Sequence, residues 1–245
     1  MSHMKSDQKQ GSRKVAKTIQ QESVNVSPQT VRRRLREQGA HYKHPYKAPT
    51  LSENNRIKRI DWSKRYQKHD WYRTVFTDEK IFYLGNETGR VWIVPGGDNV
   101  RKTKKARFKL HIWGGISYQG KTDLHEFQGR VTSQSYQKCL SSTFMKYWHK
   151  WTYDGQWWMQ QDGAPPHTSK STMDFLKRKK INIIDWPAQS PDLNPIENLW
   201  GWMQHELNKH DIRNRQQLRD KVFQIWKEIP QQQTCNLIES MNSRL

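Results

Sequence analysis

Three acidic residues stand in settings that could form a metal-binding active site. Asp78 follows the apolar residues Val75 and Phe76, and Asp162 follows the run WWMQQ at 157–161, so each is predicted on a strand or at its end. Glu197 lies in the first turn of a predicted helix. Magnesium prefers oxygen ligands, so two strand-borne aspartates and one helix-borne glutamate that converge would hold two Mg²⁺ ions.

The helix that carries Glu197 begins within residues 189–200, which read QSPDLNPIENLW. Asn194 is the predicted N-cap and Pro195 the first helical residue. Apolar residues then recur at helical spacing: Ile196, Leu199, Trp200, Met203 and Leu207. A glutamate three residues after an N-cap could instead close a capping box on the backbone, and from the local pattern both interpretations remain open.

The sequence around the three carboxylates is more specific than the carboxylates themselves, because any chain with 23 acidic residues contains such a triple. The segments TDE at 77–79, QDGAPPH at 161–167 and SPDLNPIENLW at 190–200 occur in that order. Together they resemble the catalytic signature of the mariner superfamily of cut-and-paste DNA transposases. The 34 residues between Asp162 and Glu197 resemble the branch that contains Sleeping Beauty. The resemblance extends from about residue 12 to the end of the chain.

The resemblance implies a function and a set of roles. A transposase of this kind excises an element bounded by inverted repeats through metal-dependent hydrolytic cleavage, and then joins the 3′ ends to target DNA at a TA dinucleotide. Asp78 would bridge two Mg²⁺ ions, with Asp162 on one ion and Glu197 on the other, and Mn²⁺ could substitute. We therefore expect double-stranded DNA as partner, both transposon ends and target, a homodimer assembled on those ends, and a nuclear location.

The predicted elements favour an α/β fold. Strands are expected at 73–79, 90–94, 109–116, 122–127, before Asp162 and at 181–185, and helices at 133–150, 169–179, 216–228 and 233–241. Strands first, and then alternating strands and helices around three carboxylates, are typical of a ribonuclease-H-like fold, a mixed sheet flanked by helices. We assign this catalytic domain to residues 71–245.

Charge and composition restrict the class of partner. The formal net charge is +20, from 43 Lys and Arg against 23 Asp and Glu, which favours a polyanion such as nucleic acid. No apolar run approaches the length of a membrane-spanning helix and no signal peptide opens the chain, which disfavours a membrane partner. Cys139 and Cys235 lack a metal-ligand spacing, so we expect free thiols in a reducing compartment.

A small all-α helix-turn-helix is predicted at residues 12–39. Ser12 can cap a first helix that runs to about residue 22, and Ser27 with Pro28 opens a second helix with Val31 and Leu35 inward. Ser27 and the arginines on the outer sides of this second helix are candidate DNA contacts: Arg32, Arg33, Arg34 and Arg36. A solvated basic helix would show the same pattern.

The resemblance places this helix-turn-helix within a larger unit. Mariner-type transposases carry a bipartite, paired-type DNA-binding region before the catalytic domain, and residues 27–39 resemble the last helix of its second half. The first half, and the leading helix of the second half, have no counterpart, so we expect an N-terminally shortened form with a partial domain. Residues 1–11 begin with MSHM, which resembles the remnant of an expression tag, and are expected to be disordered.

Two further basic segments are candidate DNA contacts. Residues 40–70 read as a basic linker, with Lys43 and Lys47, followed by a connecting helix after Ser52. The loop at 95–108, within a segment of about 85–110, carries five basic candidates: Arg101, Lys102, Lys104, Lys105 and Arg107. Charge alone leaves open a solvated hairpin, a nuclear-import signal or a DNA clamp, and the resemblance implies a clamp loop that reaches the partner subunit.

Two other functions, and an active-site role for His167, are compatible with parts of the sequence. A host-adopted or decayed transposase that only binds DNA is disfavoured because all three carboxylates are present. A ribonuclease-H-like nuclease acting on RNA hybrids is disfavoured by the helix-turn-helix. His167 could be a fourth active-site residue, but the preference of Mg²⁺ for oxygen favours a turn histidine fixed by Pro165 and Pro166.

Overall fold

The computed structural model describes residues 26–37, 51–83, 108–153 and 155–245. The chain divides into two compact units, residues 1–48 and 49–245, and each is described by itself. The predicted first helix at 12–22, the predicted strand at 90–94, Lys43, Lys47 and the five basic residues of the loop at 95–108 lie outside the described residues.

Helix α3 (Pro28–Glu37) is the described helix of the first unit. It begins where the sequence predicts, because the Ser27 hydroxyl accepts a hydrogen bond from the Thr30 backbone N–H at 3.1 Å. Val31 is buried. The four candidate arginines, Arg32, Arg33, Arg34 and Arg36, are exposed, and two of them, Arg33 and Arg34, form ion pairs with Glu37.

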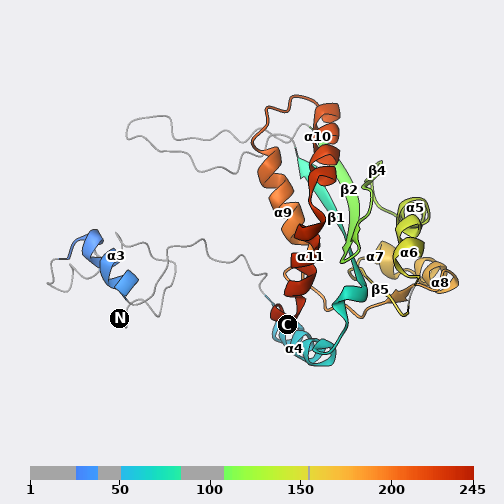
Figure 1. The fold of residues 1–245 in the computed structure, drawn as a ribbon, viewed down its shortest axis with the longest axis horizontal. Helices are drawn as coiled ribbons and strands as arrows, with labels where there is room; N and C mark the ends of the chain where they lie inside the picture. Colours follow the sequence, from blue (N-terminus) through green and yellow to red (C-terminus); the bar gives the residue numbers. More distant parts are fainter. Residues whose placement is uncertain (1–25, 38–50, 84–107, 154) are drawn as a thin grey trace. The chain divides into compact units, whose positions relative to one another are not determined.

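A mixed sheet is the centre of the second unit (Figure 1). Strand β1 (Thr74–Tyr83) pairs antiparallel with β2 (Lys109–Ser117) and parallel with β5 (Trp158–Gln160). The short strands at the edges are β3 (Gly120–Lys121) and β4 (His125–Phe127), both antiparallel to β2, and β6 (Asn182–Ile183), parallel to β5. This strand arrangement is the one expected for a ribonuclease-H-like fold.

Helices cover both faces of the sheet (Figure 1). One face is covered by α9 (Ile196–Leu207), α10 (Arg215–Glu228) and α11 (Gln231–Glu239), which is followed by η3 (Ser240–Ser243). The other face is covered by α5 (Ser133–Cys139), the π-helical η2 (Leu140–Phe144), α6 (Met145–Trp151), α7 (Pro165–Thr168) and α8 (Lys170–Arg178). Each layer has its own apolar core.

Strand β1 contributes to both cores because its side chains alternate between the two faces. Phe76 and Phe82 belong to the core under α9 and α10, whereas Val75 belongs to the core under α5 and α6. Asp78 and Lys80 lie two and four residues after Phe76 on the strand, so their side chains lie on the same face as Phe76, the α9 face. Glu79 lies on the opposite face.

The connecting helix α4 (Glu53–Tyr66) and the short η1 (Trp71–Arg73) lead into β1. Ser52 caps α4 as predicted, through its hydroxyl and the Asn55 N–H. Trp62 of α4 is buried in the core under α9 and α10, and it donates its indole N–H to the backbone carbonyl of Asp185. This helix therefore packs as part of the second unit.

Strand lengths differ from the predicted ones at two places. The strand predicted at 122–127 is only His125–Phe127. At Thr122 the side-chain hydroxyl, and not the backbone carbonyl, accepts the Gly115 N–H at 2.9 Å. The Thr122 carbonyl instead accepts the indole N–H of Trp226. The strand predicted at 181–185 is limited to Asn182–Ile183. The remaining predicted helices and strands of the described part are confirmed, with their ends shifted by a few residues.

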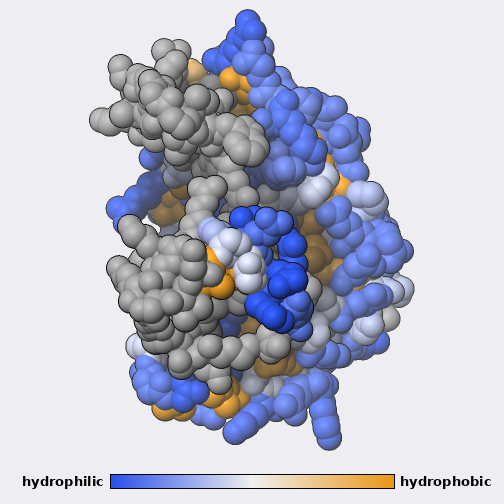
Figure 2. Space-filling model, turned by 90° about the vertical axis from the view of Figure 1, so that its left-hand side faces the viewer, coloured by the Kyte–Doolittle hydropathy of each residue, from blue (hydrophilic) through white to orange (hydrophobic). Residues whose placement is uncertain are grey.

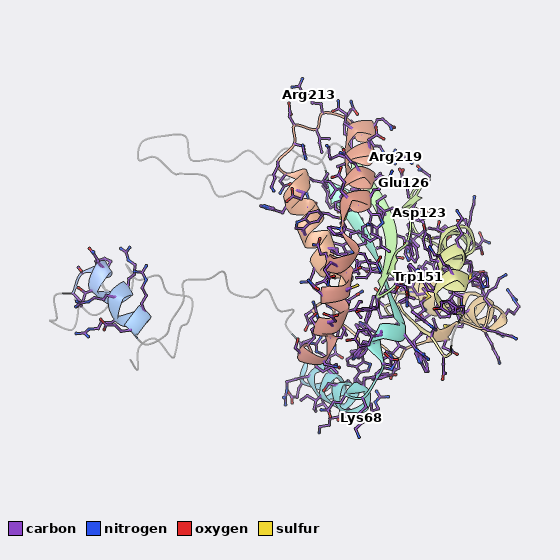
Figure 3. The ribbon with its side chains drawn as sticks, in the orientation of Figure 1. Lys68, Asp123, Glu126, Trp151, Arg213 and Arg219 are labelled. Atoms are coloured by element: carbon purple, nitrogen blue, oxygen red, sulfur yellow. The ribbon has the colours of Figure 1, made fainter. Side chains whose placement is uncertain are left out.

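The described surface in Figure 2 is mostly hydrophilic, in keeping with a mean hydropathy of −1.10. Within the part of the chain that the structure describes, no helix has the length and apolar character to cross a membrane. At the surface, β4 is joined to α10 by an ion-pair cluster, in which Glu126 contacts Arg215 and Arg219 (Figure 3). Glu126 is only 9% exposed, so this cluster fixes α10 against the edge of the sheet.

Candidate active site

Asp78 occupies the middle of β1, on the face covered by α9. Its Oδ2 accepts a hydrogen bond from the indole N–H of Trp200 at 3.0 Å. Burial raises the pKa of Asp78 well above its usual range, and the negative charges of Glu197 and Glu79 raise it further. The carboxylate thus lies in a buried environment with an excess of negative charge.

Glu197 is brought to the same face by the start of α9. The side chain of Asn194 fixes this point twice: its Oδ1 accepts from the Ile196 N–H at 3.4 Å, and its Nδ2 donates to the Thr77 carbonyl of β1 at 3.2 Å. The prediction of Asn194 as N-cap and Pro195 as first helical residue is wrong by one residue, because the helix begins at Ile196 and Pro195 is its N-cap, without a side-chain cap. The hydrogen bond from Asn194 to Thr77 holds the start of α9 beside β1, next to Asp78.

The Glu197 carboxylate is directed toward β1. Its Oε2 lies 3.9 Å from the Nζ of Lys80, which shares the face of Asp78. Burial raises the pKa of Glu197, whereas the positive charge of Lys80 lowers it. This position favours a role beside Asp78 over a capping box.

Asp162 follows β5 by two residues. In the parallel register Phe76 pairs with Gln160, so Asp78 and Asp162 each lie two residues beyond the same paired position. Thr77 fastens the two strands just before this point, by donating its hydroxyl to the Gln160 carbonyl at 2.8 Å. The backbone therefore carries the two aspartates to the same end of adjacent parallel strands.

The side chain of Asp162 is turned toward α7. Its Oδ1 accepts from the Ala164 N–H at 3.0 Å and lies 2.6 Å from the Nδ1 of His167. The hydrogen bond with His167 lowers the pKa of Asp162. Because the side chain is 56% exposed, it has room to rotate.

His167 is the buried link between Asp162 and β1. Its Nε2 lies 3.1 Å from Oε1 of Glu79, and its ring lies 4.1 Å from the ring of Tyr136. Burial lowers the pKa of His167, but the hydrogen bonds to Asp162 and Glu79 raise it by more, to about 10. His167 is thus more than a turn histidine: its two ring nitrogens lie within hydrogen-bond distance of two carboxylates, Asp162 and Glu79, which favour its protonated form.

The structure brings Asp78 and Glu197 together and leaves Asp162 on His167. Among residues 26–37, 51–83, 108–153 and 155–245, no three His, Cys, Asp or Glu side chains form a cluster that could hold a metal ion as they stand. The pair on the α9 face nevertheless suits a hard divalent cation, because both donors are carboxylates and, after burial, the negative charge of Glu197 contributes to the raised pKa of half-buried Asp78. Rotation of Asp162 away from His167 would add a third carboxylate.

Sequence reasoning missed three neighbours of these carboxylates: Glu79, Lys80 and Trp200. Trp200 was assigned only to the apolar face of α9, because helical periodicity does not reveal what an indole N–H contacts. The alternation of β1 was a usable signal for Lys80, since residues two apart on a strand share a face.

The sequence of this chain is similar to those of known transposases. Residues 73–219 match the family model described as DDE superfamily endonuclease, and residues 1–68 match a helix-turn-helix model described as transposase. The Tcb2 transposase of Caenorhabditis briggsae is 32% identical over 231 residues, which are 90% of this chain and 84% of that protein. The Tc1 transposase of Caenorhabditis elegans is 31% identical over 228 residues, or 89% and 83%.

Solved structures show the same fold. The Mos1 transposase paired-end complex with left transposon end aligns with a TM-score of 0.76 and 22% identity, over 99% of this chain and 74% of that chain. A Mos1 strand transfer complex aligns with a TM-score of 0.72. The ribonuclease-H-like fold and the N-terminal helix-turn-helix expected from the sequence are confirmed, and the chain belongs to the Tc1/mariner family of DNA transposases.

Proposed function

We propose that this transposase cleaves DNA at the inverted-repeat ends of its element and transfers the 3′ ends into a TA dinucleotide of target DNA. Asp78, Asp162 and Glu197 are the metal ligands in this proposal. The observation that carries it is the pair of carboxylates on the α9 face: half-buried Asp78 in the middle of β1, and Glu197 on the helix start that Asn194 fastens to the neighbouring Thr77.

Membership of the DDE endonuclease superfamily implies divalent metal ions. We assign two Mg²⁺ ions, for which Mn²⁺ can substitute, and Mos1 complexes with Mg and with Mn support that choice. When bound, such ions lower the barrier for attack of water or a 3′-hydroxyl on the phosphodiester and stabilise the leaving oxygen.

The residues of this chain prepare the site for that reaction. Asp78 supplies a carboxylate that is desolvated and close to Glu197, so its negative charge is concentrated where a cation would be held. Lys80 offsets part of the charge of Glu197 from 3.9 Å. Asp162 joins the pair when it leaves the His167 hydrogen bond or uses its other oxygen, because a carboxylate has two oxygens that accept.

DNA binding belongs to the first unit and to the basic segments. The Mos1 paired-end complex contains a transposon end, which supports double-stranded DNA ends as the partner here. The exposed arginines of α3 would lie against phosphates or base edges. In this proposal the assembled form is a homodimer on paired ends, the loop at 95–108 is its clamp, and the protein acts in the nucleus.

The test is strand transfer with a defined substrate. The protein is incubated with a pre-cleaved duplex that carries the element's terminal inverted repeat and a TA-containing plasmid, with Mg²⁺, Mn²⁺ or EDTA. Joined product with either metal and none with EDTA is the expected result. Retention of the duplex without product under both metals would instead support the alternative of a transposase that only binds DNA.

A further inference from the structure

The indole of Trp200 is fixed in place around a contact with Asp78. Trp200 is fully buried, and its N–H donates to Oδ2 of Asp78 at 3.0 Å. The ring stacks on Trp226 with 5.2 Å between centroids and 27° between planes, and Phe82 meets it edge-on at 6.0 Å. The indole of Trp200 is therefore enclosed in a packed aromatic core.

Strand β2 leaves room for this ring at the position opposite Asp78. Gly114 is the antiparallel register partner of Asp78, and a Cβ at residue 114 would lie 2.9 Å from Cη2 of Trp200. A contact that short occurs in no relaxed side chain, so any larger residue would displace the indole. The indole of Trp200 therefore fits in this position only because residue 114 is a glycine.

The same helix turn carries Glu197 three residues earlier, on the same stretch of α9. Asn194 fixes the start of that turn to the Thr77 carbonyl, next to Asp78 in the chain. One rigid turn of α9 thus delivers both an acidic side chain and a hydrogen-bond donor to β1. Their relative placement does not depend on a loop.

We propose that Trp200 is a positioning residue that orients the carboxylate of Asp78 for the metal, an inference that rests on the proposed function. An indole N–H donates only and carries no charge, so it fixes one carboxylate oxygen without neutralising the negative charge that a cation needs. The Glu79 backbone N–H also donates to this carboxylate. Partners of this kind typically change metal affinity or activity by 10- to 100-fold when removed.

The test compares two tryptophans of the same aromatic stack. Trp200→Phe keeps a ring and removes the N–H that reaches Asp78. Trp226→Phe is the matched control, because it also loses one indole hydrogen bond, which goes to the Thr122 backbone carbonyl at 2.7 Å and not to an acidic group. Asp78→Asn is the reference for loss of the ligand itself.

Three quantities are measured for each variant: strand transfer at saturating end DNA, Mn²⁺ binding without DNA from the electron paramagnetic resonance of the free ion, and end-DNA affinity. We expect Trp200→Phe to lower the rate and the Mn²⁺ affinity by about 10- to 100-fold with DNA affinity unchanged. Trp226→Phe should stay within about threefold of wild type in all three, since it removes an ordinary core hydrogen bond.

Each contrary outcome has a distinct meaning. Equal rates and equal Mn²⁺ affinities for Trp200→Phe and Trp226→Phe would overturn the positioning role and leave only packing. An active Asp78→Asn would overturn the proposed function and this inference with it, whereas an inactive Asp78→Asn beside a normal Trp200→Phe would overturn this inference alone. If Trp200→Phe does not fold, benzothienylalanine at residue 200, which fills the same space and has no N–H, takes its place with the same expected losses.

Discussion

Asp78 and Glu79 are neighbours on β1 with the same charge, yet the fold surrounds them in opposite ways. On one face Glu79 lies 3.1 Å from His167, whose raised pKa makes it a cation within the protein. On the other face Asp78 receives a neutral indole donor and lies near a second carboxylate, Glu197. Negative charge is thus neutralised internally on the α7 face and left in excess on the α9 face.

This difference separates a structural carboxylate from one that suits a metal. A buried carboxylate costs free energy unless a positive group accompanies it. For Glu79 the fold supplies that group. Asp78 is accompanied by a neutral indole donor and by the negative charge of Glu197, and Lys80 on the same face pairs with Glu197. The charge of Asp78 is therefore available to a divalent cation.

The largest expected effect separates the two faces directly. Asp78→Asn, Asp162→Asn and Glu197→Gln should each lower strand transfer by roughly 10³-fold or more, because each removes charge that phosphodiester chemistry cannot obtain from water. Glu79→Gln keeps the shape and hydrogen bonding of the side chain on the other face, so its rate of strand transfer should fall far less. Gel assays of joined product measure the rates, with end-DNA binding as the control for folding.

One outcome would correct the assignment of the third ligand. A Glu197→Gln protein that joins DNA at the normal rate with Mg²⁺, and loses only about 1 kcal/mol of stability, would show that Glu197 closes a capping box. Asp192 or Glu206 would then be the carboxylates to test.

His167→Phe should have the next largest effect, and its stability cost should depend on pH. The pKa of His167 is raised from 6.5 to about 10 in the folded protein, so its stabilising charge is fully present below pH 6.5 and is lost as pH rises through about 10. The difference in unfolding free energy between wild type and His167→Phe should therefore be largest near pH 6 and shrink toward pH 10. Urea unfolding in EDTA measures it.

A constant difference across that range would mean that His167 is neutral and only packs on Tyr136. The activity of His167→Phe offers a second check on the two faces. We expect a loss of roughly 10- to 100-fold, smaller than for Asp162→Asn, because the variant frees Asp162 without removing it.

Arg59→Ala should have a smaller effect, on the segment that precedes Glu197. Arg59 donates from α4 to the Ser190 hydroxyl at 2.6 Å and to Oδ1 of Asp192 at 2.8 Å, and its side chain is only 18% exposed. Its loss should lower stability by about 1–2 kcal/mol, the value of charged hydrogen bonds. It should also slow strand transfer by a few-fold, since α9 starts from this segment.

The control for Arg59 lies on the same helix. Arg65 pairs with Asp185 at 3.1 Å, but both side chains are more than half exposed, so Arg65→Ala should change stability by less than about 0.5 kcal/mol. Equal effects of the two substitutions on denaturant midpoints would show that Arg59 is an ordinary surface pair.

The smallest effect on chemistry should come from the first unit. Replacing Arg32 and Arg33 of α3 with alanine should weaken end-DNA binding and make its salt dependence shallower by roughly 2 units if both contact phosphates. The rate at saturating DNA should not change. An unaltered slope in binding titrations would mean that this helix is a solvated basic surface.

Local signals in the sequence predicted the elements that carry the site. The caps at Ser27 and Ser52 depend on neighbours within four residues and are found in the structure. The helix that carries Glu197 is also found, but it starts one residue later than predicted, at Ile196. The strand predicted at 122–127 was too long because the Thr122 hydroxyl replaces a backbone acceptor, a tertiary event.

Contacts between distant segments could not be predicted. The turn of Asp162 onto His167, and the bond from Trp200 to Asp78, join residues 5 and 122 positions apart, and they depend on side-chain rotamers and on the packing of α9. Hydrophobic periodicity placed Trp200 in the core correctly, but the direction of a single N–H within a core leaves no trace in an apolar pattern.

The parallel pairing of β1 with β5 also affects how the enzyme comes into being. Thr74 pairs with Trp158, which lies 84 positions later in the chain, so the chain must close a long loop before this contact can form, and such non-local pairing is slow. Glu197 arrives later still, with a helix that follows both strands in the chain. In a nascent polypeptide the α3 arginines, which we propose as DNA contacts, are therefore made well before the proposed metal site can be completed.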